Sequence, residues 1–172
     1  MLYYSMLKIF EIQTKGDKMK NNQKERLNRF FVHVFNQILS WEEKSFKESG
    51  ITDITLRELH VIEAVYHLIE SRNNKMADIA EFLSITPGSL TTSVNILVKK
   101  GYLKREGSES DRRVVYIVPT EKAAEVNEIH AKFHSDMIDE ALPLIDGDRI
   151  EPLLDALERL EVFFEERCGN RK

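Results

Sequence analysis

The stretch that decides the fold is TPGSLTTSVNILVKKGYLKREGSESDRRVVYIV, residues 86–118. Its first half predicts a helix, because Thr86 can cap the first turn and Pro87 suits the first helical position. Apolar residues recur along one side at helical spacing, at Leu90, Val94, Leu97 and Val98. Gly101 follows and predicts the end of the helix.

The opposite side of this helix carries short polar side chains. Its residues are Gly88, Thr92, Asn95 and Lys99, with Ser89 and Thr91 on the flanks. Such side chains can bind base edges and phosphates in DNA. An ordinary solvated helix face gives the same pattern, so the helix alone leaves both interpretations open.

The second half of the stretch predicts a basic β-hairpin. Residues 102–105 and 114–118 are rich in β-forming side chains, and the turn between them ends in Arg112 and Arg113. The whole stretch carries a net charge of +3 in a chain of net charge −4. A helix followed by a basic hairpin is the arrangement of a winged helix-turn-helix that contacts DNA, with a merely solvated hairpin as the alternative.

The remaining sequence predicts helices, so the fold class is mostly α with a small β-hairpin wing. Thr55 and Glu58 predict a capping box at the start of one helix. The helices at both ends of the chain have broader apolar faces than a small core can bury, which favours packing against a second copy. We therefore expect a winged helix-turn-helix with terminal dimerisation helices. Its regions are an N-terminal arm or a mis-assigned start at 1–22, a dimerisation helix at 23–50, a DNA-binding lobe at 51–120 and C-terminal dimerisation helices at 121–168.

Composition narrows the functional class of this 172-residue chain. Its single cysteine, Cys168, rules out a disulfide within the chain and suits a reducing cytosol. No apolar run approaches the roughly 20 residues that span a membrane. Phosphate-binding loops and nucleophile motifs are missing as well. We expect a cytoplasmic protein that has no contact with membranes, is not an enzyme and requires no cofactor.

The segment resembles the MarR family of bacterial transcription regulators. The resemblance rests on Leu90-Thr91, Leu97, Gly101-Tyr102-Leu103, Arg105, Asp111-Arg112-Arg113 and Pro119-Thr120. It implies a homodimer on a near-palindromic operator in double-stranded DNA, with Asp111 stiffening the wing and Arg112 or Arg113 entering the minor groove. The predicted DNA-binding residues are Ser89, Thr91, Thr92, Asn95, Lys99, Asp111, Arg112 and Arg113.

Within that family, one branch is particularly similar. Thr92 stands where many members have an arginine, and this helix together with residues 108–115 resembles the fatty-acid-biosynthesis repressor (FabT) branch. The resemblance implies repression of fatty-acid synthesis genes, with long-chain acyl-acyl carrier protein or another hydrophobic molecule as effector. The predicted effector pocket consists of Phe31, Val34, Phe35, Ile38, Leu59, Ile62, Ile129 and Phe133. An apolar stripe at helical spacing is also what a plain core gives.

Two alternatives remain open. His130 and His134 share one helix face, and His60 with Glu63 lies on another helix that could approach them, as in some MarR-type zinc-uptake repressors. No cysteine or further acidic residue is clearly positioned to complete four ligands, so a metal site is not favoured over another small-molecule effector. A winged helix used only for protein contacts is the other alternative, and it predicts DNA binding with little dependence on salt.

Overall fold

The computed structural model describes residues 21–108, 111 and 114–169. The chain divides into two compact units, one ending at Trp41 and the other beginning at Glu42. No helix in the described ranges is long and apolar enough to cross a membrane.

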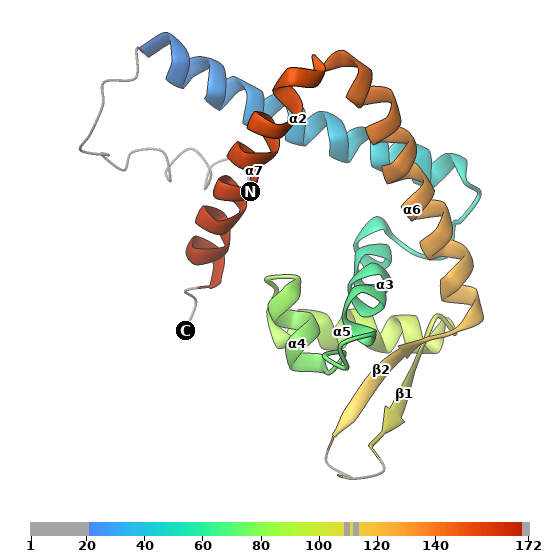
Figure 1. Ribbon diagram of the computed structural model, residues 1–172. Helices are drawn as coiled ribbons and strands as arrows, with labels where there is room; N and C mark the ends of the chain where they lie inside the picture. Colours follow the sequence, from blue (N-terminus) through green and yellow to red (C-terminus); the bar gives the residue numbers. More distant parts are fainter. Residues whose placement is uncertain (1–20, 109–110, 112–113, 170–172) are drawn as a thin grey trace. The chain divides into compact units, whose positions relative to one another are not determined.

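The first helix, α2 (Asn21–Glu48), runs through the first unit and into the second (Figure 1). It carries five large apolar side chains that are exposed to solvent, Leu27, Phe30, Phe35, Leu39 and Trp41. The predicted helix with a broad apolar face is therefore confirmed.

Three helices and a hairpin form a lobe within the second unit. They are α3 (Leu56–Ile69), α4 (Met76–Phe82), α5 (Pro87–Lys99), β1 (Leu103–Gly107) and β2 (Val115–Pro119). Their contacts enclose one hydrophobic core, which includes Leu59, Ile62, Ile79, Leu90, Val94, Leu97, Leu103 and Ile117, each at most 2% exposed. This is the mostly helical fold with a small hairpin that the sequence predicts.

The boundaries of α5 follow from its flanking residues. Thr86 accepts a hydrogen bond from the amide of Ser89 at 3.2 Å, and Pro87 occupies the first turn. Beyond the helix, Gly101 has a φ of +80°, a conformation that glycine adopts without the steric cost of a Cβ. The amide of Tyr102 donates back to the carbonyl of Leu97 at 2.9 Å, which turns the chain into β1.

The hairpin is antiparallel and tied to the rest of the lobe. Its register pairs Leu103 with Pro119 and Gly107 with Val115. The amide of Ile117 donates to the carbonyl of Asn74 at 2.9 Å, and the Asn74 side chain donates to the carbonyl of Ile117 at 2.8 Å. The base of the wing is thus fixed to the segment that precedes α4.

The chain continues as α6 (Glu121–Ala141), a short 3-10 turn η1 (Leu142–Leu144) and α7 (Gly147–Gly169). Thr120 caps α6 by accepting from Ala123, and its hydroxyl lies 2.7 Å from the carbonyl oxygen of Gly101 and 3.0 Å from that of Tyr102. Along α7 several large apolar side chains are exposed, including Leu153, Leu154, Leu157, Val162, Phe163 and Phe164.

Candidate nucleic-acid interface

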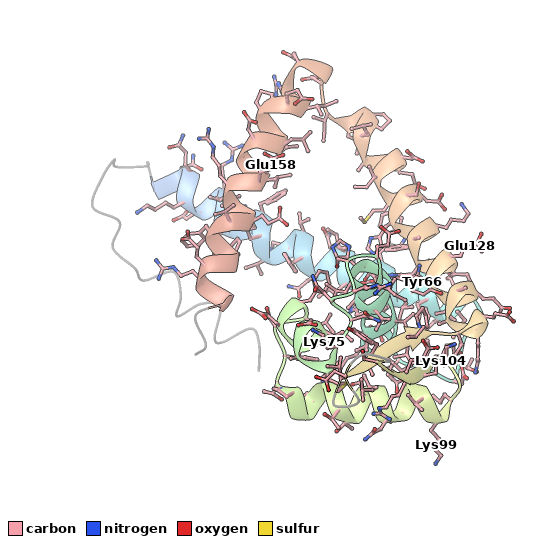
Figure 2. All side chains as sticks on the ribbon, turned by 60° about the horizontal axis from the view of Figure 1, so that its bottom comes forward. Tyr66, Lys75, Lys99, Lys104, Glu128 and Glu158 are labelled. Carbon is pink, nitrogen blue, oxygen red and sulfur yellow. The ribbon has the colours of Figure 1, made fainter. Side chains whose placement is uncertain are left out.

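The polar side of α5 is exposed. The predicted contact residues on this helix, Ser89, Thr91, Thr92, Asn95 and Lys99, all lie at the surface. The opposite side, with Leu90, Val94 and Leu97, is fully buried in the lobe. Lys99 extends outward from the end of α5 (Figure 2). The lobe therefore presents a narrow strip of short polar side chains that ends in a lysine.

Hydroxyl groups on this strip donate back to their own helix. Thr91 Oγ1 donates to the carbonyl of Pro87 at 2.7 Å, and Thr92 Oγ1 donates to that of Gly88 at 3.1 Å. A hydroxyl has one hydrogen and two lone pairs. In this arrangement the two threonines offer methyl groups and hydrogen-bond acceptors to a partner.

A second element contributes a residue that is missing from the sequence-based prediction. Arg105, on β1, donates from Nη2 to Oδ1 of Asn95 on α5 at 2.7 Å. Side chains alternate along a strand, so Arg105 lies on the same face of β1 as the buried Leu103. This alternation was the signal in the sequence that could have placed Arg105 beside α5.

The wing carries the remaining predicted contacts. Arg112 and Arg113 lie outside the described residues. Asp111 is described and exposed, and the chain around it is closed by backbone hydrogen bonds from Ser108 to Val114 and from Val114 to Asp111. Toward the base of the wing, Lys104 pairs with Glu106 at 2.7 Å.

One ion pair connects the end of α5 to the start of α3. The carboxylate of Glu58 accepts from Thr55 N at 2.7 Å, which completes the predicted capping box, and from Lys100 Nζ at 3.1 Å. Since the Glu58 side chain is only 8% exposed, this ion pair fixes the C-terminal end of α5 to the start of α3.

Asp53 makes a comparable link between the lobe and α6. It accepts from the Tyr102 hydroxyl and from Lys122 Nζ, each at 2.7 Å. The hydrogen bonds from Lys122 and then Tyr102 hold the pKa of Asp53 below its usual value. Burial, followed by the bond to Asp53, raises the pKa of Tyr102.

The residues predicted for an effector pocket have different surroundings. In the first unit, Phe31, Val34 and Ile38 are half-buried, and Phe35 is 60% exposed. In the second unit, Leu59 and Ile62 belong to the closed core of the lobe, Phe133 is buried and Ile129 is 39% exposed. Leu59 and Ile62 therefore contribute to the hydrophobic core of the lobe.

The three predicted histidines do come together, around a carboxylate. Glu42 Oε1 lies 2.8 Å from His60 Nε2 and 2.6 Å from His130 Nε2, and His134 Nε2 lies 3.1 Å from His130 Nε2. Glu63 Oε1 is 3.6 Å from His130 Nδ1. These five residues are named the Glu–His cluster below.

Glu42 is an acidic residue beside the histidines that the sequence did not identify as a possible ligand. It is 4% exposed, and it precedes His60 by 18 residues and His130 by 88, so spacing in the sequence gives no sign of it. Burial alone would raise its pKa, but hydrogen bonds from His130 and His60 outweigh burial and lower the pKa of Glu42. The carboxylate is therefore held in its charged form inside the protein.

Comparison with known proteins agrees with this architecture. The model of the MarR family matches residues 54–115, which include α3, α4, α5 and most of the wing. The HTH-type transcriptional regulator MhqR of Bacillus subtilis (strain 168) is 30% identical over 104 residues, which cover 60% of this chain and 69% of MhqR.

Solved structures give the same result. Streptococcus pneumoniae FabT in complex with DNA has a TM-score of 0.75 at 30% identity, over 83% of this chain and 98% of that one. The S. aureus MepR–DNA complex shares the fold, with a TM-score of 0.63 at 16% identity over 78% of this chain and 95% of that one. The exposed polar strip of α5, the adjacent hairpin and these relatives lead to one conclusion: the chain belongs to the MarR family of DNA-binding transcriptional regulators, which are not enzymes.

Proposed function

We propose that the protein is a homodimeric repressor that binds a near-palindromic operator through α5 and the wing. The observation that carries this proposal is the exposed strip of Ser89, Thr91, Thr92, Asn95 and Lys99 on a helix whose other side is buried. A helix of this kind enters the major groove, where side chains meet base edges. Asp111, Arg112 and Arg113 extend the contact to the neighbouring minor groove.

The dimer is supported by apolar surface at both ends of the chain. Exposed leucines and phenylalanines line α2 and α7, and a soluble monomer rarely leaves large apolar patches in contact with water. A two-fold dimer places its recognition helices about one turn of DNA apart, roughly 34 Å. The operator should therefore consist of two half-sites in inverted orientation.

The DNA interface is tested by two substitutions. Asn95→Ala and Arg113→Ala should each weaken operator binding in a gel shift, by roughly tenfold, while circular dichroism shows a folded protein. Lys132→Ala removes a positive charge that pairs with Asp136 within α6, and it serves as the control. Unchanged affinity in both variants would refute this interface. Steep loss of binding with rising salt separates phosphate contact from a module used only for protein contacts.

The regulated genes are proposed to be those of fatty-acid synthesis, with long-chain acyl-acyl carrier protein as corepressor. Support comes from the sequence around Thr92 and residues 108–115, and from the 30% identity to the DNA-bound FabT. Adding long-chain acyl-acyl carrier protein to a gel shift on the protein's own promoter should strengthen binding. Acyl carrier protein without the acyl chain is the control, and an equal effect of both forms would contradict the proposal.

A second candidate is metal-responsive regulation, which the Glu–His cluster favours. Zinc binds imidazole nitrogens and carboxylate oxygens in tetrahedral sites, whose ligand atoms lie about 3.3 Å apart. The ligand atoms of Glu42, His60 and His130 lie within 4.8 Å of one another, as do those of Glu63, His130 and His134. Three elements, α2, α3 and α6, supply these residues, so a bound ion would fix their relative positions.

Zinc binding to the Glu–His cluster can be measured without DNA. Titration with zinc in competition with a chromophoric chelator should show one ion per chain, and His130→Ala should lower the affinity at least about tenfold. His67→Ala is the control, because His67 packs against Phe82 instead of joining the cluster. Equal zinc affinity in both variants would exclude the Glu–His cluster as the zinc site. A gel shift that responds to zinc but not to acyl-acyl carrier protein would favour this candidate over the lipid effector.

A further inference from the structure

We propose that Asn95 and Arg105 read one operator base pair as a single unit, in which Arg105 determines which bases Asn95 can bind. The proposal rests on the placement of α5 in the major groove given above. It adds Arg105, a residue of the wing strand, to the residues that set sequence specificity.

The chemistry of the contact fixes the orientation of the Asn95 amide. An arginine side chain only donates hydrogen bonds, and an asparagine offers one acceptor oxygen and one donor nitrogen. Because Arg105 Nη2 lies 2.7 Å from Asn95 Oδ1, the carbonyl of the amide is turned toward the wing. The NH₂ group of Asn95 is then the part that remains for a base.

The backbone that carries the two side chains is held by hydrogen bonds and core packing. Asn95 is six residues before Gly101, whose φ of +80° starts the tight connection to β1. Thr120 holds the carbonyls of Gly101 and Tyr102 at 2.7 and 3.0 Å, and Leu103 is buried in the core. Contacts within the lobe alone therefore bring the backbones at positions 95 and 105 together.

Specificity follows from which hydrogen-bonding groups α5 presents. A free asparagine recognises adenine through a paired contact, accepting from N6 and donating to N7. With its oxygen turned toward Arg105, Asn95 presents its NH₂ group to a base, so it gains most from base edges that offer acceptors, namely guanine O6 and N7 or thymine O4. The hydroxyls of Thr91 and Thr92 donate within the helix, so the Asn95 NH₂ group is the donor that this part of α5 offers to a base.

The test is a selection of bound sequences from a pool of random DNA duplexes, carried out with the intact protein. Wild type should select a guanine or thymine at one position of each half-site. Arg105→Ala frees the Asn95 carbonyl and should move the preference at that position toward adenine by about fivefold. Asn95→Ala should abolish preference at the same position, and the double variant should behave like Asn95→Ala alone.

Lys104→Ala is the matched control. Lys104 precedes Arg105 and has the same charge, but it lies on the other face of β1 and pairs with Glu106. Its loss should weaken binding without changing any base preference. Asn95, Lys104 and Arg105 are all exposed, so thermal melting should confirm that each variant folds like wild type.

Three results would overturn the proposal. If Arg105→Ala weakens binding equally for every base and reduces the slope of log affinity against log salt by about one, Arg105 is a phosphate contact. If Arg105→Ala and Asn95→Ala change different base positions, the two residues read DNA independently. If Asn95→Ala changes no preference although wild type selects an operator, Asn95 is not a reader. Failure of wild type to select any sequence would instead refute sequence-specific binding itself.

Discussion

Glu58 combines two stabilising roles in one buried carboxylate. It completes the capping box of α3 with Thr55 and pairs with Lys100 at the end of α5. Removing one partner of a buried ion pair leaves the other without compensation, although Lys100, at 30% exposed, still reaches water. The residue therefore matters for the placement of α5 as well as for α3.

Substitution of Glu58 should separate these two roles. Glu58→Ala should lower the free energy of unfolding by about 2 kcal/mol, because both the cap and the ion pair are lost. Glu58→Gln keeps an acceptor for the cap and should cost about half as much. Urea denaturation measures both, with the exposed Glu128→Gln as control. Equal losses for alanine and glutamine would show that the cap contributes little.

Asp53 makes stability depend on acid. Its pKa is lowered in the folded state, so the stabilisation from Lys122 and Tyr102 is present above the pKa of the unfolded state, about 3.9, and is lost as pH falls through the folded pKa. Asp53→Asn lacks this dependence. The difference in urea midpoint between wild type and Asp53→Asn should therefore narrow on acidification. Tyr102→Phe removes one of the two hydrogen bonds to Asp53, so its difference in urea midpoint from wild type should narrow less on acidification. If the difference between wild type and Asp53→Asn stays constant with pH, the bonds to Asp53 do not cause the acid dependence.

At the scale of elements, two glycines at the ends of α5 have different backbone conformations. Gly101 has a φ of +80° after the helix ends, whereas Gly88 lies inside the first turn without positive φ. A Cβ at either position meets no atom within 4 Å, so only the backbone conformation distinguishes them.

Alanine at these two positions should therefore change stability in opposite directions. Gly101→Ala should cost about 1–2 kcal/mol of unfolding free energy, because a side chain disfavours the left-handed conformation. Gly88→Ala should add about 0.5 kcal/mol, because alanine restricts the unfolded chain and suits a helix. Thermal melting of the two variants compares them directly. A stabilising Gly101→Ala would mean that the junction after α5 can relax.

The elements themselves were predictable from sequence, whereas the contacts between distant elements were not. Local signals such as Thr86, Pro87, Gly101 and the capping box of Thr55 fix helix ends, and the structure confirms them. Glu42 was missed because tertiary packing brings its partners to it, and Arg105 was missed although strand alternation indicates its face of β1, because its partner Asn95 lies on another element. Local sequence records which face a residue lies on but not what a remote helix places opposite it.

At the scale of the whole molecule, the apolar surface of α2 and α7 predicts that two copies associate as the protein concentration rises. Leu157, 44% exposed on α7, lies among exposed leucines and phenylalanines. Leu157→Glu should raise the dissociation constant of the dimer by about tenfold or more, because a charge in an apolar interface loses its hydration. Sedimentation equilibrium measures this change, and Glu158→Ala, on the neighbouring position, is the control. A monomeric wild type at all concentrations would rule out the dimer.

The hydrogen bonds of Thr120 link the orientation of α6 to that of α5. It begins α6 and at the same time binds the two carbonyls that follow α5, so the end of one helix and the start of the other share a joint. With 21 residues, α6 extends about 30 Å from this joint. Tilting it by about ten degrees at Thr120 displaces its far end by roughly 5 Å. Conversely, a displacement of about 5 Å at the far end of α6 corresponds to a rotation of only about ten degrees at Thr120. A large movement at that end would therefore reach the end of α5 as a small change in orientation.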